Sequence, residues 1–139
     1  MAITFQKQKY VSEAEQVIRS MAQKQFKVAK EKRKFDELTT TQLRGLLALT
    51  SNIYDVVRNQ GVKVAEERLM YFRVKLVYQG GRNAAVKELV DQSDLLGILE
   101  YIQGVIEDGD EKLEKELIIR LCRYMEALVA YFKYYGGKD

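Results

Sequence analysis

Residues 111–135 read EKLEKELIIRLCRYMEALVAYFKYY, and their pattern sets the class of fold. Apolar and aromatic residues recur every three or four positions, which is the period of one face of an α-helix. The main row comprises Leu117, Leu121, Tyr124, Leu128, Tyr131 and Tyr135. We predict a long helix over 111–135 whose apolar face packs inside the domain.

The rest of the chain shows the same helical period in further segments. They run over 11–23, from the threonine caps at 39–41 to 59, over 62–79, and from 83 to 104 with a restart at Ser93-Asp94. We expect the glycine pair at 80–81 to end one of these helices. The chain has no proline and no stretch of β-type alternation. We therefore predict an all-α fold, a compact bundle of about five helices, as one domain over 1–139 with an N-terminal tail at 1–10 and a basic loop at 24–37.

The composition argues against an enzyme. The 139 residues include no histidine, which excludes Ser-His-Asp and Cys-His nucleophiles and a Cys/His zinc site. The lone Cys122 lies within an apolar run, so we expect a small buried side chain and not a nucleophile. The acidic turn at 107–110 is too short and irregular for an EF-hand, and no phosphate-binding glycine motif is present. We therefore predict no catalytic residue, no metal and no cofactor.

The same counts bear on the cellular compartment. A single cysteine cannot form an internal disulfide, which favours a reducing environment. No apolar run approaches the roughly 18–20 residues of a membrane span, and residues 1–10 lack the apolar core of a signal peptide. We expect a cytoplasmic protein with no membrane contact.

The net charge of +3 is unevenly distributed. Residues 1–34 carry a net +6 and residues 44–87 a net +5, whereas residues 88–116 carry a net −8. Such zoning suggests one surface for a polyanion and another for a basic neighbour. An ordinary solvated surface, with opposite zones pairing inside the fold, would show the same counts.

Several cations stand out by position. Arg44 lies in the first turn of its helix, where it opposes the helix dipole. Arg73 falls close to an apolar row, so it must pair with a carboxylate or reach across a subunit or ligand boundary. Arg82 precedes a helix start, where backbone amides favour phosphate. A face of alternating cations and aromatics suits nucleic acid binding. Surface side chains that extend their polar ends to solvent would give the same sequence pattern. Its members are Arg68, Tyr71, Lys75 and Tyr78.

Four strings carry a resemblance to a known family. They are LTTTQLR at 38–44, YFRV at 71–74, LVYQGGR at 76–82 and RYMEALVAYFKYYGGK at 123–138. Together they resemble the small subunit of the type III-A CRISPR effector, the Csm complex. The resemblance covers essentially the whole chain from Ser12 onward.

The resemblance implies a small all-α bundle without catalytic activity that serves antiviral defence. Several copies would stack as an inner filament beside the backbone subunits, which hold the guide RNA, and the large subunit. The copies would line the groove where guide and target RNA pair and touch the target through its phosphates. RNA cleavage would belong to the backbone subunits. DNA cleavage and cyclic oligoadenylate synthesis would belong to the large subunit.

Individual basic residues match the motifs of that family. The predicted RNA-binding residues are Arg44, Arg73, Arg82, Arg123 and Lys133, with Arg68 and Lys75 as possible additional contacts. The Lys-rich stretch at 24–34 is longer and more basic than the resemblance implies. The alternative is a helical protein–protein adaptor with no direct RNA contact, whose charge zones serve assembly alone.

Overall fold

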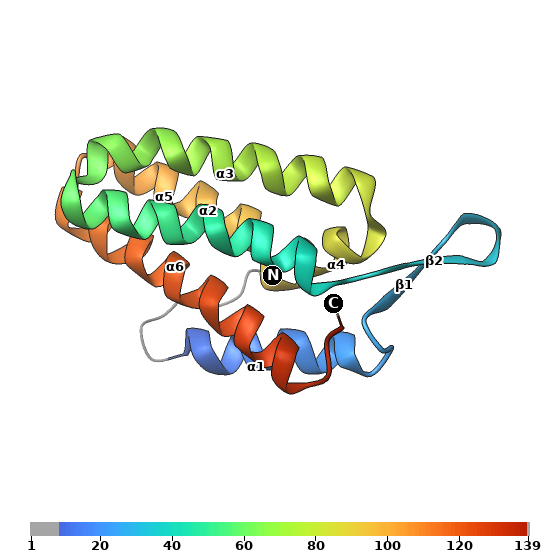
Figure 1. Cartoon of the computed structure of the whole chain (residues 1–139). Helices are drawn as coiled ribbons and strands as arrows, with labels where there is room; N and C mark the ends of the chain where they lie inside the picture. Colours follow the sequence, from blue (N-terminus) through green and yellow to red (C-terminus); the bar gives the residue numbers. More distant parts are fainter. Residues whose placement is uncertain (1–8, 139) are drawn as a thin grey trace.

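The structure, a computed structural model, describes residues 9–138. Its elements are α1 (Tyr10–Ala22), β1 (Lys27–Lys30), β2 (Lys34–Glu37), α2 (Thr40–Asn59), α3 (Val62–Arg82), α4 (Ala84–Ser93), α5 (Leu95–Asp108) and α6 (Glu111–Tyr134). In Figure 1, α2 lies between α3 and α6, α5 lies behind them, α1 packs against α6, and α4 and the strands occupy one end. The predicted all-α bundle is confirmed.

The apolar face of α6 lies at the centre of one continuous core. It packs mainly against α2 and α1, and to a lesser extent against α5. Leu117, Leu121, Tyr124 and Leu128 are buried as the sequence pattern predicts, while Tyr131 and Tyr135 are half-buried. The Tyr124 hydroxyl donates a hydrogen bond to the Ser93 carbonyl at 3.0 Å, so this buried polar group has a partner.

Helix boundaries depart from the sequence prediction at three places, the simplest being α5, which continues past the expected end at 104 to Asp108. The glycine pair does not end α3, which continues through Arg82. Gly80 is buried against α4, where an added β-carbon would lie 3.6 Å from the Lys87 backbone, so this glycine brings two helices together. The expected restart at Ser93-Asp94 is a complete break, because Asp94 adopts the left-handed conformation. The described residues therefore form six α-helices where about five were expected.

Other expected boundaries agree with the structure more closely. Asn83 caps α4 as predicted, since its Oδ1 accepts hydrogen bonds from the amides of Ala85 and Val86 at 2.8 and 3.0 Å. Of the predicted tail at 1–10, residues 1–8 lie outside the described residues, and Tyr10 already belongs to α1. Within residues 9–138, no helix is both long and apolar enough to cross a membrane.

The predicted basic loop at 24–37 is wrong in one respect, because most of it is a β-hairpin. The strands pair antiparallel, from Lys27 opposite Glu37 to Lys30 opposite Lys34. In the connecting turn, Lys32 and Arg33 have φ angles of 58° and 63°. Glycine or asparagine usually occupies this left-handed region. The sequence carries neither residue at these positions, so no local sequence signal predicted the turn.

The hairpin is tied to the helices at its base. The buried Phe26 ring packs edge-on against Phe132, with 4.7 Å between ring centroids. The Asp36 carboxylate accepts a hydrogen bond from the Ala84 amide at 2.7 Å and pairs with Lys30 at 3.0 Å. These partners hold the pKa of Asp36 below its ordinary value. The projecting part of the hairpin therefore starts from a fixed root.

Two glutamates meet inside the bundle, where α3 packs against α6. Glu114 is almost completely buried beside Glu66, and its Oε2 has no hydrogen-bond donor among the described residues, whereas Glu66 Oε2 lies 3.9 Å from the Lys63 ammonium. Burial, followed by the neighbouring Glu66 carboxyl, raises the pKa of Glu114 to about 7. A proton shared between two such groups relieves both the repulsion and the desolvation.

The core position of Phe132 leads to a first prediction. Its side chain has no exposed surface, whereas Tyr134 on the same helix is 79% exposed. We expect Phe132→Ala to lower the free energy of unfolding by about 3–5 kcal/mol, because it opens a cavity beneath the hairpin root. Tyr134→Ala, the matched control, should change it by less than about 0.5 kcal/mol. Urea denaturation measures both, and similar losses in the two variants would contradict this view of the core.

The Glu66–Glu114 contact predicts pH-dependent stability. A carboxyl group whose pKa is raised from 4.5 to about 7 on folding contributes stability that is complete below pH 4.5 and is lost as the pH rises to about 7. We expect Glu114→Gln to be more stable than the wild type at pH 8 and to lose this dependence. Urea midpoints between pH 4.5 and 8 test this, with the exposed Glu116→Gln as control. Parallel profiles for Glu114→Gln and wild type would count against it.

Candidate nucleic-acid interface

Helix α2 lies between α3 and α6, and one side of it faces outward (Figure 1). A capping box starts the helix, in which the Thr39 amide donates to Gln42 Oε1 at 2.8 Å. In the first half of the helix the exposed residues include the small Gly45 and Ala48, whereas the second half exposes Asp55 and Arg58. Arg44 is exposed in the first turn and makes no ion pair with any residue in 9–138. A partner could therefore approach the backbone of α2 closely and meet a cation at its start.

A groove of about 480 Å³ runs between the first half of α2 and the end of α3. Gly45 on α2 and Lys75, Tyr78 and Arg82 on α3 line it. The Arg82 guanidinium lies 5.6 Å from the Tyr78 ring centroid, and the Lys75 ammonium lies 5.4 Å from that of Tyr71. The predicted face of alternating cations and aromatics is thus present, with Arg68, Tyr71 and Tyr78 exposed and Lys75 half-buried.

Farther along the same border, Arg68 contacts α2 directly. Its guanidinium donates a hydrogen bond to Asn52 Oδ1 at 2.7 Å. The side chains of both residues are exposed. Arg68 therefore belongs with Lys75 and Arg82 on the α3 side of α2.

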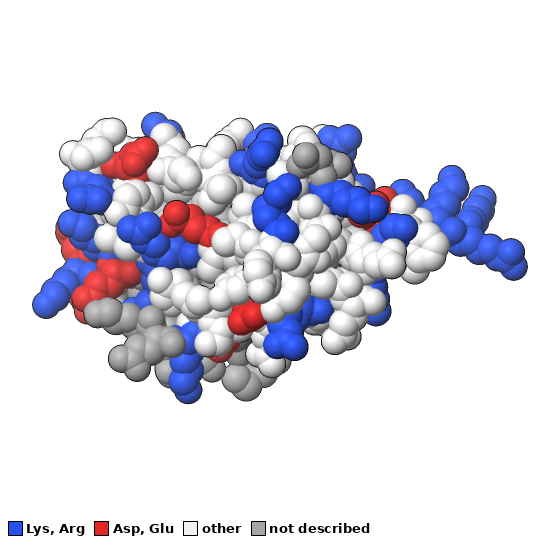
Figure 2. All heavy atoms as spheres, turned by 60° about the horizontal axis from the view of Figure 1, so that its bottom comes forward, with Lys and Arg blue, Asp and Glu red and all other residues white. Residues whose placement is uncertain are grey.

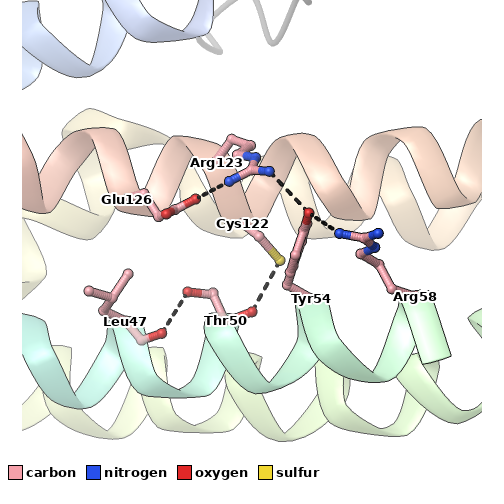
Figure 3. Close-up of polar contacts among 7 residues, drawn as sticks. All are labelled: Leu47, Thr50, Tyr54, Arg58, Cys122, Arg123 and Glu126. Carbon is pink, nitrogen blue, oxygen red and sulfur yellow. Dashed lines mark hydrogen bonds and ion pairs between the residues drawn. The ribbon is translucent and has the colours of Figure 1, made fainter. Parts of the chain in front are cut away.

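A second group of cations lies on the α6 side of α2 (Figure 3). Arg123 on α6 and Arg58 on α2 each donate a hydrogen bond to the Tyr54 hydroxyl at 3.0 Å. The Arg123 guanidinium also lies 4.8 Å from the centroid of the Tyr54 ring and pairs with Glu126 at 3.1 Å, which raises its pKa. Sequence reasoning identified Arg123 but missed Tyr54 and Arg58, whose spacing of four on one helix was the available signal.

Lys133 approaches the start of α2 from the end of α6. Its ammonium donates to Thr40 Oγ1 at 3.4 Å. The Thr40 amide donates in turn to the Lys138 carbonyl at 2.9 Å, which ties the C-terminal segment to α2. Lys133 is exposed and sits near the end of α2 that carries Arg44.

Six of the seven predicted cations thus lie on or against α2. We call this surface the α2 face and define it by Arg44, Arg68, Lys75, Arg82, Arg123 and Lys133. Arg73 is the exception, because it extends toward α5 and pairs with Glu100 at 3.4 Å. Its position beside an apolar row allowed either pairing with a carboxylate or a contact across a subunit or ligand boundary. The structure shows the pairing with a carboxylate.

The α2 face offers cations and aromatic rings but no reactive group. Cys122 is buried behind it and donates to the Thr50 carbonyl at 3.2 Å (Figure 3). Burial raises the pKa of its thiol to about 12, which keeps it protonated and unreactive. Within residues 9–138 no group of three or more potential metal ligands is found. The chemistry available is electrostatic attraction of an anion, with ring stacking beside it.

The fold and the α2 face define a class, a small helical protein that presents a row of cations on one side. Comparison with known proteins is more specific. A sequence model described as Csm2 type III-A matches residues 13–138. "CRISPR system Cms protein Csm2" of Mycobacterium tuberculosis (strain CDC 1551) is 43% identical over 134 residues, 94% of each chain.

Two further relatives carry the same name. The protein of Streptococcus thermophilus is 44% identical over 102 residues, which cover 73% of this chain and 76% of the relative. That of Enterococcus italicus is 33% identical over 109 residues, 76% of this chain and 73% of the relative. The chain belongs to the Csm2 family of type III-A CRISPR systems, as the motifs at 38–44, 71–74, 76–82 and 123–138 predicted.

The burial of Cys122 predicts its reactivity. With its pKa at about 12, the thiol should not react with a thiol reagent such as DTNB at pH 8 while the protein is folded, and it should react fully in concentrated urea. The control variant Cys122→Ala/Ser51→Cys carries its thiol at an exposed position of α2 and should react at once. Rapid labelling of the folded wild type would show that the α2–α6 contact opens readily.

Proposed function

We propose that this chain is the non-catalytic small subunit of a cytoplasmic type III-A CRISPR effector complex. It binds the sugar–phosphate backbone of the guide–target RNA duplex in antiviral defence. One observation carries the proposal, namely that six cations from three helices gather on or against α2, while Asp55 is the one exposed carboxylate of that helix. Family membership supports the assignment to the complex.

The composition of the α2 face suits contacts with phosphate more than with bases. Phosphate contacts provide affinity without sequence information, and base contacts need donors and acceptors aimed into a groove. The α2 face has guanidinium and ammonium groups on both sides of α2. In an RNA-guided complex the pairing of guide and target reads the sequence, so a protein surface that binds only the backbone is sufficient.

The partners we propose are the guide and target RNA, the backbone and large subunits, and further copies of this chain in a filament. An exposed apolar row on α3 supports protein contacts, because Met70, Val74 and Val77 lie on one side of the helix and Met70 is 65% exposed. Arg73 lies beside this row and away from the α2 face. Its proposed contact with RNA therefore depends on how neighbouring subunits place the duplex.

The adaptor alternative rests on specific contacts. Arg68, Arg123 and Lys133 already donate hydrogen bonds within the chain, which is enough to explain their placement structurally. The apolar row of α3 would serve an adaptor equally well. Arg44 and Lys75 distinguish the two functions most directly, because no carboxylate in 9–138 pairs with either.

The decisive measurement is the binding of labelled duplex RNA to the full chain at several salt concentrations. We expect Arg44→Ala/Lys75→Ala to weaken binding and to reduce the slope of log K against log salt by about 1 for each lost phosphate contact. The double variant Lys112→Ala/Lys115→Ala is the control, since it removes the same charge from exposed positions in the first turns of α6. Its slope should stay close to that of the wild type.

Two outcomes would contradict the proposal. If wild type and both double variants share one affinity and one slope, binding does not use the α2 face. If the folded wild type binds no duplex RNA but still joins the other subunits of the complex in co-purification, the adaptor function is correct. Circular dichroism confirms that each variant is folded before it is compared.

A further inference from the structure

The hairpin forms one wall of a cleft that shares only Arg82 with the α2 face. The cleft has a volume of about 580 Å³ and lies between the hairpin, the end of α3 and the start of α4. Five cations from these three elements line it: Lys30, Lys32, Lys34, Arg82 and Lys87. Figure 2 shows Lys and Arg side chains gathered at this end of the molecule, with several projecting from the hairpin into solvent.

Among residues 9–138, the cations that line this cleft outnumber the carboxylates. The lining includes two carboxylates, Glu31 and Asp36. Asp36 already accepts a hydrogen bond from the Ala84 amide and pairs with Lys30. These two partners largely compensate its charge at the root of the hairpin. Lys87 makes one exposed ion pair, with Asp91 at 3.7 Å. Like charges held close together raise the local potential and attract an anion.

Two glycines form the floor of the cleft, and one of them, Gly81, leaves its backbone open. Gly80 and Gly81 lie there in the last turn of α3. A β-carbon added to Gly81 would meet no atom within 4 Å, so open space lies directly above this residue. Glycine in a helix costs stability relative to alanine, and a close approach by another molecule is one reason to find it there. A polymer backbone would fit over this floor between the two walls of cations.

The cleft continues the α2 face. Arg82 lines both the cleft and the groove between α2 and α3. A strand that lies along this groove, past Lys75 and Tyr78, therefore reaches Arg82 and then the hairpin.

We propose that this cleft binds the phosphodiester backbone of an RNA strand that continues beyond the α2 face. The inference rests on the proposed RNA-binding function and adds a second contact site to it. The contacts of Asp36 and Phe26 tie the root of the hairpin to the helices, so its strands are in place before RNA binds. An acidic segment of another protein fits less well, because the lining contains no large apolar side chain of the kind that forms the centre of a protein interface.

The test compares three charge-matched double variants of the full chain on one probe, a fluorescein-labelled single-stranded oligouridine. They are Lys32→Ala/Lys34→Ala in the cleft, Arg44→Ala/Lys75→Ala on the α2 face, and Lys112→Ala/Lys115→Ala as control. Each phosphate contact on a single strand contributes about 0.7 to the salt slope, so the cleft variant should lose about 1.4. The control should keep the wild-type slope.

A steric pair of variants tests the same cleft independently of the lysines. Gly81→Ala and Gly81→Glu both place a side chain in open space on a helix, so both should remain folded. Gly81→Ala leaves most of the cleft open and should bind the probe within about twofold of the wild type. Gly81→Glu fills the cleft with a carboxylate and should weaken binding at least tenfold, a change that corresponds to about 1.4 kcal/mol.

The outcomes separate this inference from the proposed function. If only the α2-face variant loses affinity, the cleft does not bind RNA and the proposed function stands. If no wild-type binding to the probe or to duplex RNA is seen, both fail. If Lys32→Ala/Lys34→Ala keeps its RNA affinity but loses self-association in sedimentation velocity, the cleft binds a second copy of the chain and the inference is wrong.

Discussion

The structure depends on burial of the apolar face of α6. A helix of 24 residues with Leu117, Leu121, Leu128 and Phe132 along one side is stable only when other helices cover that side. Helices α1, α2 and α5 provide the cover, and the segment after α6 returns to the first residue of α2. This arrangement leaves one side of α2 outward. The candidate interface is a consequence of how α6 is covered.

The same packing places the basic and the acidic residues of the chain on different helices and sides. Because α2 lies between α3 and α6, polar side chains at the edges of both helices meet over it. Those edges carry arginines and lysines next to tyrosines, as in the contact of Arg123 and Arg58 with Tyr54. Most of the acidic residues of 88–116 belong to α4, α5 and the first turns of α6. A net charge of +3 therefore conceals a strongly basic side, and the hairpin lysines extend it.

Helical periodicity predicted most of the fold, since a buried row of one helix is a local property. Tyr124, Leu128 and the Asn83 cap lie where the sequence pattern predicts. The hairpin was missed because Lys32 and Arg33 occupy left-handed positions without the usual glycine. The end of α3 was predicted too early because a glycine pair signals either a stop or a close helix contact, and only the position of α4 distinguishes them. The Glu66–Glu114 contact joins two helices and leaves no local signal.

The sequence by itself determined the helical class, the absence of histidine chemistry and the family, because composition, period and motif strings are all properties of the linear chain. It also identified seven candidate cations, but it could not group them. Only the tertiary structure decided that Arg68, Arg123 and Lys133 all contact α2, across separations of 16, 69 and 93 residues, while Arg73 turns toward α5. The physical reason is that a shared surface depends on which helices pack together, and long-range burial sets that packing.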